Sequence, residues 1–170
     1  PSVALPPWWT LVGADSGSFT ASVPIAPLTV DGATGAVGTY ASMTLASGAP
    51  SIGYFDSGNG LLLFVRAAGA SGSTWDEPRV AAAAVDVRGA SLGVVDGHPA
   101  FAYIDYTDWD LRYVRANDWR GNEWPAASLV LDGQNAAAVG WVSLAVIDGL
   151  PAIAYGYHGT ADEIRFIRAL

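Results

Sequence analysis

The chain has 170 residues, 51% of them hydrophobic and only 14% charged, so we expect one folded domain with a sizeable core and no extended disorder. The net charge is −8 and the few basic residues form no cluster, which argues against binding to nucleic acid. Cysteine is absent, which excludes disulfides and zinc–thiolate sites, and no apolar run approaches the roughly 18 residues of a membrane-spanning helix.

The strongest pattern is an internal repeat of about 50 residues. Three copies begin at Ser42, Ser91 and Ser143, which are 49 and 52 residues apart. Each copy ends in an aromatic and aliphatic run followed by Arg-Ala, and the third carries one inserted residue. A period of this length is typical of architectures in which similar units stack on one another.

Four strands are predicted in each copy, taken in chain order. The first strand ends at a tight turn, which is Asp-Gly at 96–97 and 148–149 and the weaker Ser-Gly at 47–48. The second strand follows a proline, a residue that fits the first position of a strand. The third is the run that ends at Arg66, Arg115 or Arg168. A weaker fourth strand is predicted near residues 80–85 and 128–131.

Small and large residues alternate along the second strand of the later copies. The sequences are Ala100-Phe101-Ala102-Tyr103 and Ala152-Ile153-Ala154-Tyr155. Such a strand is apolar on both sides, so its sheet is expected to be buried on both faces, with a close neighbour over the small side. Radially stacked blades have this geometry, and the sequence predicts an all-β, β-propeller-type repeat of about three four-stranded antiparallel blades.

The first 41 residues also fit the repeat, because 27–32 (P-L-T-V-D-G) matches 128–133 (S-L-V-L-D-G). The prediction is a single domain over 1–170 with circularly permuted ends: repeats at about 42–90 and 91–142, and a third made of 143–170 plus 8–41. The early fourth strand is expected to complete the last blade. Since a closed ring takes about four to eight blades, we expect self-association or a place in a longer protein. Two copies would give six blades.

Two stretches between the third and fourth strands, 116–124 and 69–75, resemble the Asp-box of sialidase-like bacterial propeller repeats, with a degraded copy at 15–19. The resemblance covers nearly the whole chain. It implies a structural turn in which the aspartate bonds backbone donors and the tryptophan packs between strands. It implies a fold and no catalytic role, and it favours a protein exported to the surface or surroundings of a bacterium.

Three arginines recur at one position of the repeat: Arg66, Arg115 and Arg168. One interpretation is a ring of arginines that binds the hydroxyls or carboxylates of a sugar, since the guanidinium donates several hydrogen bonds at fixed angles. The alternative is a structural arginine paired within each blade, for example with Asp110 or Glu163.

The turn after the second strand of the middle copy carries Asp105, Asp108 and Asp110, whose carboxylates are candidate ligands for Ca²⁺. The alternative is a solvated hairpin tip, and no other cofactor is predicted. In the same turn Tyr106 and Trp109, together with Trp119 in a later polar turn, are candidates for an exposed ligand contact. Trp75 and Trp124 are expected in the core.

Catalysis has little support, because neither His98 nor His158 has an evident nucleophile partner. The predicted function is therefore a non-enzymatic recognition module, a lectin-like propeller that binds carbohydrate and is completed by homo-oligomerisation. One alternative is a structural or assembly subunit of a larger complex or filament, and another is a fragment of a sialidase-like glycoside hydrolase. Self-association and a glycan are the expected partners, with no nucleic acid and no membrane span.

Overall fold

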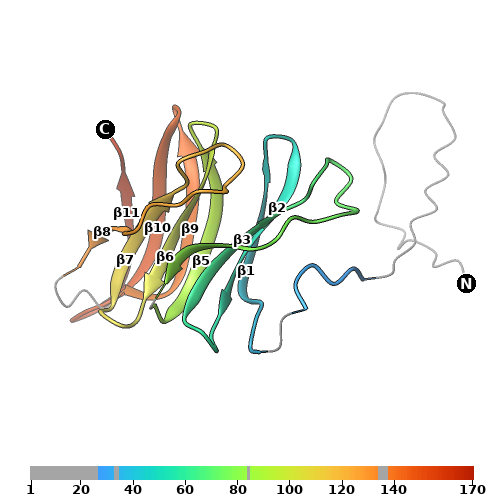
Figure 1. Cartoon of the computed structure of the whole chain (residues 1–170). Helices are drawn as coiled ribbons and strands as arrows, with labels where there is room; N and C mark the ends of the chain where they lie inside the picture. The colour runs from blue at the N-terminus through green and yellow to red at the C-terminus, as the bar shows by residue number, and fades with distance from the viewer. Residues whose placement is uncertain (1–26, 33–34, 84, 134–137) are drawn as a thin grey trace, which may run out of the picture.

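Three antiparallel sheets stand side by side in the computed structural model, which describes residues 27–32, 35–83, 85–133 and 138–170 (Figure 1). Sheet 1 has the order β1-β2-β3-β4, sheet 2 the order β5-β6-β7-β8, and sheet 3 the order β11-β10-β9. The predicted all-β fold is confirmed, and closure into a propeller ring stays a prediction. No helix long and apolar enough to cross a bilayer occurs in the described parts of the chain.

The strands lie where the repeat predicts them. In sheet 1 they are β1 (Thr39–Ala46), β2 (Ala49–Asp56), β3 (Leu61–Arg66) and β4 (Arg79–Ala83). In sheet 2 they are β5 (Val87–Val95), β6 (His98–Asp105), β7 (Asp110–Arg115) and β8 (Leu129–Asp132). In sheet 3 they are β9 (Ala138–Ile147), β10 (Leu150–His158) and β11 (Asp162–Arg168).

Each sheet begins with a hairpin whose two turn residues both have positive φ. The pairs are Ser47-Gly48 (49° and 74°), Asp96-Gly97 (51° and 76°) and Asp148-Gly149 (51° and 79°). Positive φ at both central positions is the geometry of a type I′ turn, whose twist matches that of the flanking strands. The predicted Asp-Gly hairpins are confirmed, and the Ser-Gly turn adopts the same geometry.

Neighbouring sheets pack by placing a large side chain of one against a small position of the other. We call the side of a sheet that faces the next sheet in the chain its forward face, and the opposite side its rear face. On the forward face of sheet 1, a Cβ added to Gly53 would lie 2.1 Å from Phe101 Cε1 of the rear face of sheet 2. Only glycine allows this approach. Phe101, Ala100 and Ala102 are 0% exposed, as expected for a sheet with neighbours on both faces.

A serine hydroxyl joins each pair of neighbouring first strands. The amide of Leu92 donates to Ser42 Oγ at 3.0 Å, and the amide of Leu144 donates to Ser91 Oγ at 2.9 Å. These serines open successive copies of the repeat, so the same bond links sheet 1 to sheet 2 and sheet 2 to sheet 3. The stack therefore follows one rule at both of its internal interfaces.

The predicted early fourth strand behaves differently from β4 and β8. Residues 27–32 form no strand in the structure and lie against the rear face of sheet 1, where Tyr54 Oη donates to Asp31 Oδ2 at 2.6 Å. Within the described residues, sheet 3 has three strands and nothing pairs with the outer edge of β11. The expectation that this segment completes sheet 3 of its own chain is therefore not met, because sheets 1 and 3 are at opposite ends of the stack. Residues 8–26, assigned to the same repeat, lie outside the described part of the chain.

Candidate functional site

The β6–β7 hairpin carries the aromatic candidates of the middle repeat. Asp105 and Asp110 are paired across the base of this hairpin, and Trp109 adopts a positive φ of 61° at its tip. The Trp109 ring stacks on Tyr106, with ring centroids 4.2 Å apart and an angle of 23° between the planes. Trp109 remains 45% exposed, so the pair presents an aromatic surface to solvent. The Arg88 guanidinium lies 5.7 Å from the Tyr106 ring centroid, which adds a donor beside it.

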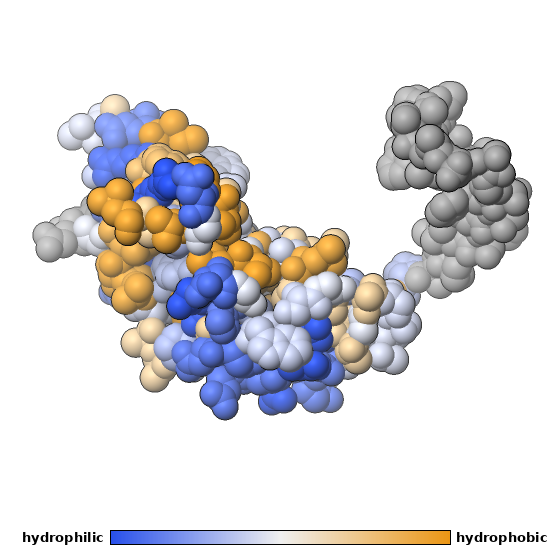
Figure 2. Space-filling model, turned by 90° about the horizontal axis from the view of Figure 1, so that it is seen from above, coloured by the Kyte–Doolittle hydropathy of each residue, from blue (hydrophilic) through white to orange (hydrophobic). Residues whose placement is uncertain are grey.

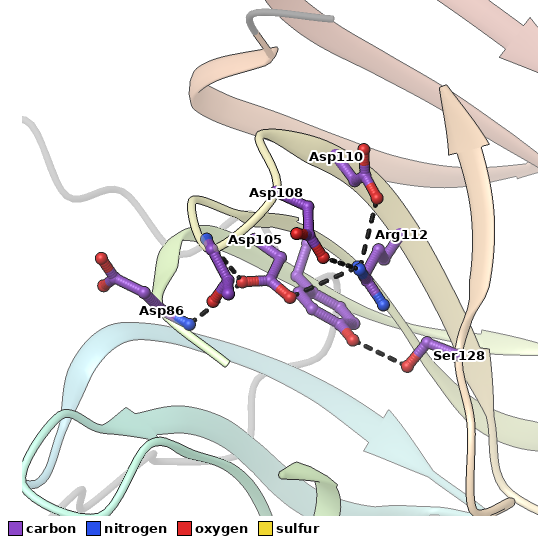
Figure 3. Close-up of polar contacts among 8 residues, drawn as sticks. Asp86, Asp105, Asp108, Asp110, Arg112 and Ser128 are labelled. Atoms are coloured by element: carbon purple, nitrogen blue, oxygen red, sulfur yellow. Dashed lines mark hydrogen bonds and ion pairs between the residues drawn. The ribbon is translucent and has the colours of Figure 1, made fainter. Parts of the chain in front are cut away.

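The three predicted metal ligands converge on an arginine instead (Figure 3). Arg112 Nη2 lies 2.8 Å from Asp108 Oδ2 and 3.2 Å from Asp110 Oδ2, and its Nε lies 3.3 Å from Asp105 Oδ2. We call these four residues the Arg112 cluster. Asp105 is 2% exposed, and its other oxygen accepts the amides of Asp86 and Thr107 at 3.1 and 3.0 Å. The guanidinium thus occupies the position that a cation would take.

Burial sets the electrostatics of the Arg112 cluster. Desolvation raises the pKa of Asp110 above its ordinary value, and the charge of Arg112 opposes that shift. Across the described residues, no group of three or more acidic or histidine side chains is arranged to hold a metal ion. The structure therefore brings Asp105, Asp108 and Asp110 together, but their arrangement favours a hairpin held by ion pairs to Arg112, and the Ca²⁺ site stays a prediction.

The three repeated arginines each reach the first hairpin turn of their own sheet. Arg66 is 7% exposed and donates to the carbonyls of Ala46, Ala67 and Ser47 at 3.1, 3.1 and 3.4 Å. Arg115 pairs with Asp96 at 3.7 Å, and Arg168 pairs with Asp148 at 2.8 Å. These contacts favour a structural role within each sheet. The partners of Arg115 and Arg168 are turn residues and not the Asp110 or Glu163 suggested by the sequence.

The aromatic candidates divide between the two ends of the sheets. The first hairpin turn and the β6–β7 turn lie at opposite ends of an antiparallel meander, so Arg66, Arg115 and Arg168 cannot join Tyr106 and Trp109 in one site. Trp119 lies at the arginine end and is 50% exposed, with the guanidinium carbons of Arg66 and Arg120 at 5.7 and 5.3 Å from its ring centroid.

The two loops that resemble the Asp-box share one local geometry. Trp75 Nε1 donates to Gly72 O at 3.0 Å, and Trp124 Nε1 donates to Gly121 O at 2.9 Å. In the second loop Asp118 accepts the amides of Arg120 and Glu123 at 2.9 and 2.7 Å. Trp124 also contacts Phe64 and Phe101, with ring centroids 5.5 and 5.6 Å apart, so it packs between sheets 1 and 2. Both loops thus hold their tryptophan by a bond to a glycine carbonyl, the second alone has an aspartate that accepts backbone amides, and kinship with the Asp-box family stays a prediction.

A tyrosine–aspartate contact between repeats was not predicted from the sequence. Tyr155 of sheet 3 donates to Asp132 at the end of β8, as Tyr54 of sheet 1 donates to Asp31. Burial, together with the bond to Asp132, raises the pKa of Tyr155 to about 12. The sequence did contain a signal for this contact. Both aspartates lie in the matched segments 27–32 and 128–133, and both tyrosines lie at one position of the repeat.

No model of a known protein family matches this sequence, and no curated protein matches it either.

Replacing Arg112 with methionine should destabilise the fold by about 3 kcal/mol at neutral pH, because it leaves two buried carboxylates without their cation. Buried carboxylates without a cation bind protons more tightly than the unfolded chain does, so the deficit should shrink as the pH falls toward 4. Urea unfolding at several pH values measures both effects. The control is Arg88→Met, which breaks an exposed pair with Asp86 and should change the free energy of unfolding far less than Arg112→Met does. A deficit that is constant with pH would contradict the assigned role.

Proposed function

We propose that this chain is a non-enzymatic assembly module, a stack of propeller-type sheets that continues at both ends onto further sheets of the same kind. The observation that carries this proposal is the exposure of side chains whose counterparts elsewhere in the repeat are buried. The two ends of the stack give separate support.

The forward face of sheet 3 is the more exposed end. Leu62 and Leu111 are both 0% exposed, whereas Ile164, at the same position of the repeat, is 85% exposed. Likewise Phe64 is 1% exposed and its counterpart Phe166 is 62% exposed. Ile164 also lines an open depression of about 670 Å³, together with Trp141, Ala154 and Gly156. Figure 2 shows apolar side chains gathered at the end of the molecule that carries sheet 3.

The rear face of sheet 1 is the other end. Met43 is 69% exposed, while its counterpart Leu92 in sheet 2 is 5% exposed because it packs against sheet 1. Leu45 on the same strand is 62% exposed. Covering a single large apolar side chain contributes about 1.5–3 kcal/mol, so these faces together provide a substantial driving force for association.

Carbohydrate recognition is a second candidate, favoured by the Tyr106–Trp109 stack. An exposed and positioned aromatic pair suits the apolar face of a sugar ring, and Asp108, whose side chain is 61% exposed, stands in the same hairpin as a hydrogen-bond acceptor. This site is compatible with the assembly proposal, since it lies at the hairpin end of a sheet and not on a stacking face. Nothing in the described geometry favours the hydrolase alternative over these two.

If the assembly proposal holds, light scattering at micromolar concentration should give a particle of at least twice the mass of one chain. Phe166→Glu should reduce that mass toward a single chain, because it places a charge on the stacking face. Leu129→Glu is the matched control, since Leu129 is 63% exposed but belongs to the central sheet. The particle formed by this variant should have the same mass as that of the wild-type protein. A wild-type protein that stays monomeric would remove the proposal.

If the β6–β7 hairpin binds carbohydrate, a glycan array should reveal a ligand, and Trp109→Ala should weaken its binding about tenfold, or ~1.4 kcal/mol. Trp119→Ala serves as the control, because Trp119 is as exposed but lies at the other end of the sheets. Equal effects of the two variants, or an array with no ligand, would count against this site.

A further inference from the structure

The outer edge of sheet 3 lacks a strand that the other two sheets possess. In sheet 1 the strand β3 pairs with β4, and in sheet 2 the strand β7 pairs with β8. In sheet 3 the equivalent strand is β11, and no described segment pairs with its outer edge. An open strand edge presents unpaired backbone donors and acceptors, which is a template for the addition of another strand.

A segment whose sequence matches that of a fourth strand lies near the start of the described part of the chain. Residues 28–31 (Leu-Thr-Val-Asp) occupy the same places in the repeat as 129–132 (Leu-Val-Leu-Asp), which form β8. Leu28 is 56% exposed, close to the 63% of Leu129 in β8. Of these two matched segments, only 129–132 pairs with a third strand in the structure.

Residues 28–31 already stand where the fourth strand of a preceding sheet would end. Asp31 accepts from Tyr54 of sheet 1 just as Asp132, at the end of β8, accepts from Tyr155 of sheet 3. Val30 packs against the cluster of Tyr54, and Leu131 packs against the cluster of Tyr155. Residues 28–31 therefore lie against sheet 1 as β8 lies against sheet 3. The difference is that β8 is paired with β7, whereas residues 28–31 belong to no sheet.

We propose that residues 28–31 of one copy of this chain add to β11 of a second copy and complete its sheet 3 as the fourth strand. A second copy is required because the segment is held on sheet 1, at the end of the stack opposite its own sheet 3. The proposal rests on the assembly function above and specifies its contact. It also covers both exposed faces, since sheet 3 of the second copy then stands behind sheet 1 of the first.

The register follows from the pairing of β7 with β8. There Tyr113 faces Leu129, Arg112 faces Val130 and Leu111 faces Asp132. At equivalent positions, Phe166 of one copy faces Leu28 of the other, Arg165 faces Thr29, and Ile164 faces Asp31. Ser143 Oγ is then placed to accept the Met43 amide of the other copy, as Ser42 and Ser91 accept within the chain. Two reciprocal contacts of this kind close six sheets, within the range of about four to eight that rings use.

The test uses the absence of cysteine from the natural sequence. Two single-cysteine variants, Leu28→Cys and Phe166→Cys, are mixed, oxidised and analysed on non-reducing gels with intact-mass detection. The expected product is a covalent dimer joining position 28 of one chain to position 166 of the other. Both side chains are exposed, so neither change disturbs the core.

A mixture of Leu28→Cys with Ile164→Cys is the out-of-register control, and the in-register pair should give about tenfold more heterodimer because a disulfide tolerates only a narrow Cα separation. Light scattering on the unoxidised proteins distinguishes the proposal that the chain assembles from the proposal that residues 28–31 are exchanged between copies. An assembly that shows no preference for the 28–166 pair would overturn strand exchange alone, and monomers would overturn both. A Leu28→Cys/Phe166→Cys double variant that closes within one chain would also overturn exchange between copies.

Discussion

The structure depends on one steric relation, in which a position without a bulky side chain on one sheet receives a large side chain from the next. Gly53 lies beneath Phe101, and an added Cβ there would come within 2.1 Å of the ring. At both internal interfaces of the stack the first strands of neighbouring sheets also share a hydrogen bond, Ser42–Leu92 and Ser91–Leu144. At the next interface a Cβ added to Gly93 would lie 3.2 Å from Leu144 Cδ2, so a small position of sheet 2 again faces a large side chain of the next sheet.

The ends of the stack follow from that relation. A repeat that buries Leu62, Phe64 and Leu111 between sheets has to leave Ile164 and Phe166 uncovered when no sheet follows. Met43 is uncovered at the other end for the same reason. We infer from these exposed faces that the chain assembles with further sheets, which would cover them as sheets 1 and 2 cover each other. The hairpin with Tyr106 and Trp109 stands apart from these faces and is free to contact a ligand.

Sequence patterns predicted much of the fold, because its determinants are local. The period of the repeat located the strands, and the Asp-Gly turns set the first hairpin of sheets 2 and 3.

Side-chain partners were harder to predict, since they depend on how separate segments meet. Arg112 contacts Asp105, Asp108 and Asp110 because β6 and β7 pair in one register. The spacing of those aspartates in the sequence did not reveal that the Arg112 guanidinium would lie between them. Similarly, the arginine at the end of the third strand binds the first hairpin turn because strand lengths place the two side by side. Export from a bacterial cell stays a prediction.

The central claim is that β11 and β1 are interface strands, and hydrogen–deuterium exchange measured across a dilution series tests it most directly. If the account is correct, amides in 162–168 and 39–46 are protected at high concentration and lose protection on dilution, while amides in 98–105 of the central sheet stay protected throughout. Fast exchange in 162–168 and 39–46 at every concentration would contradict the claim that these strands are covered by another sheet.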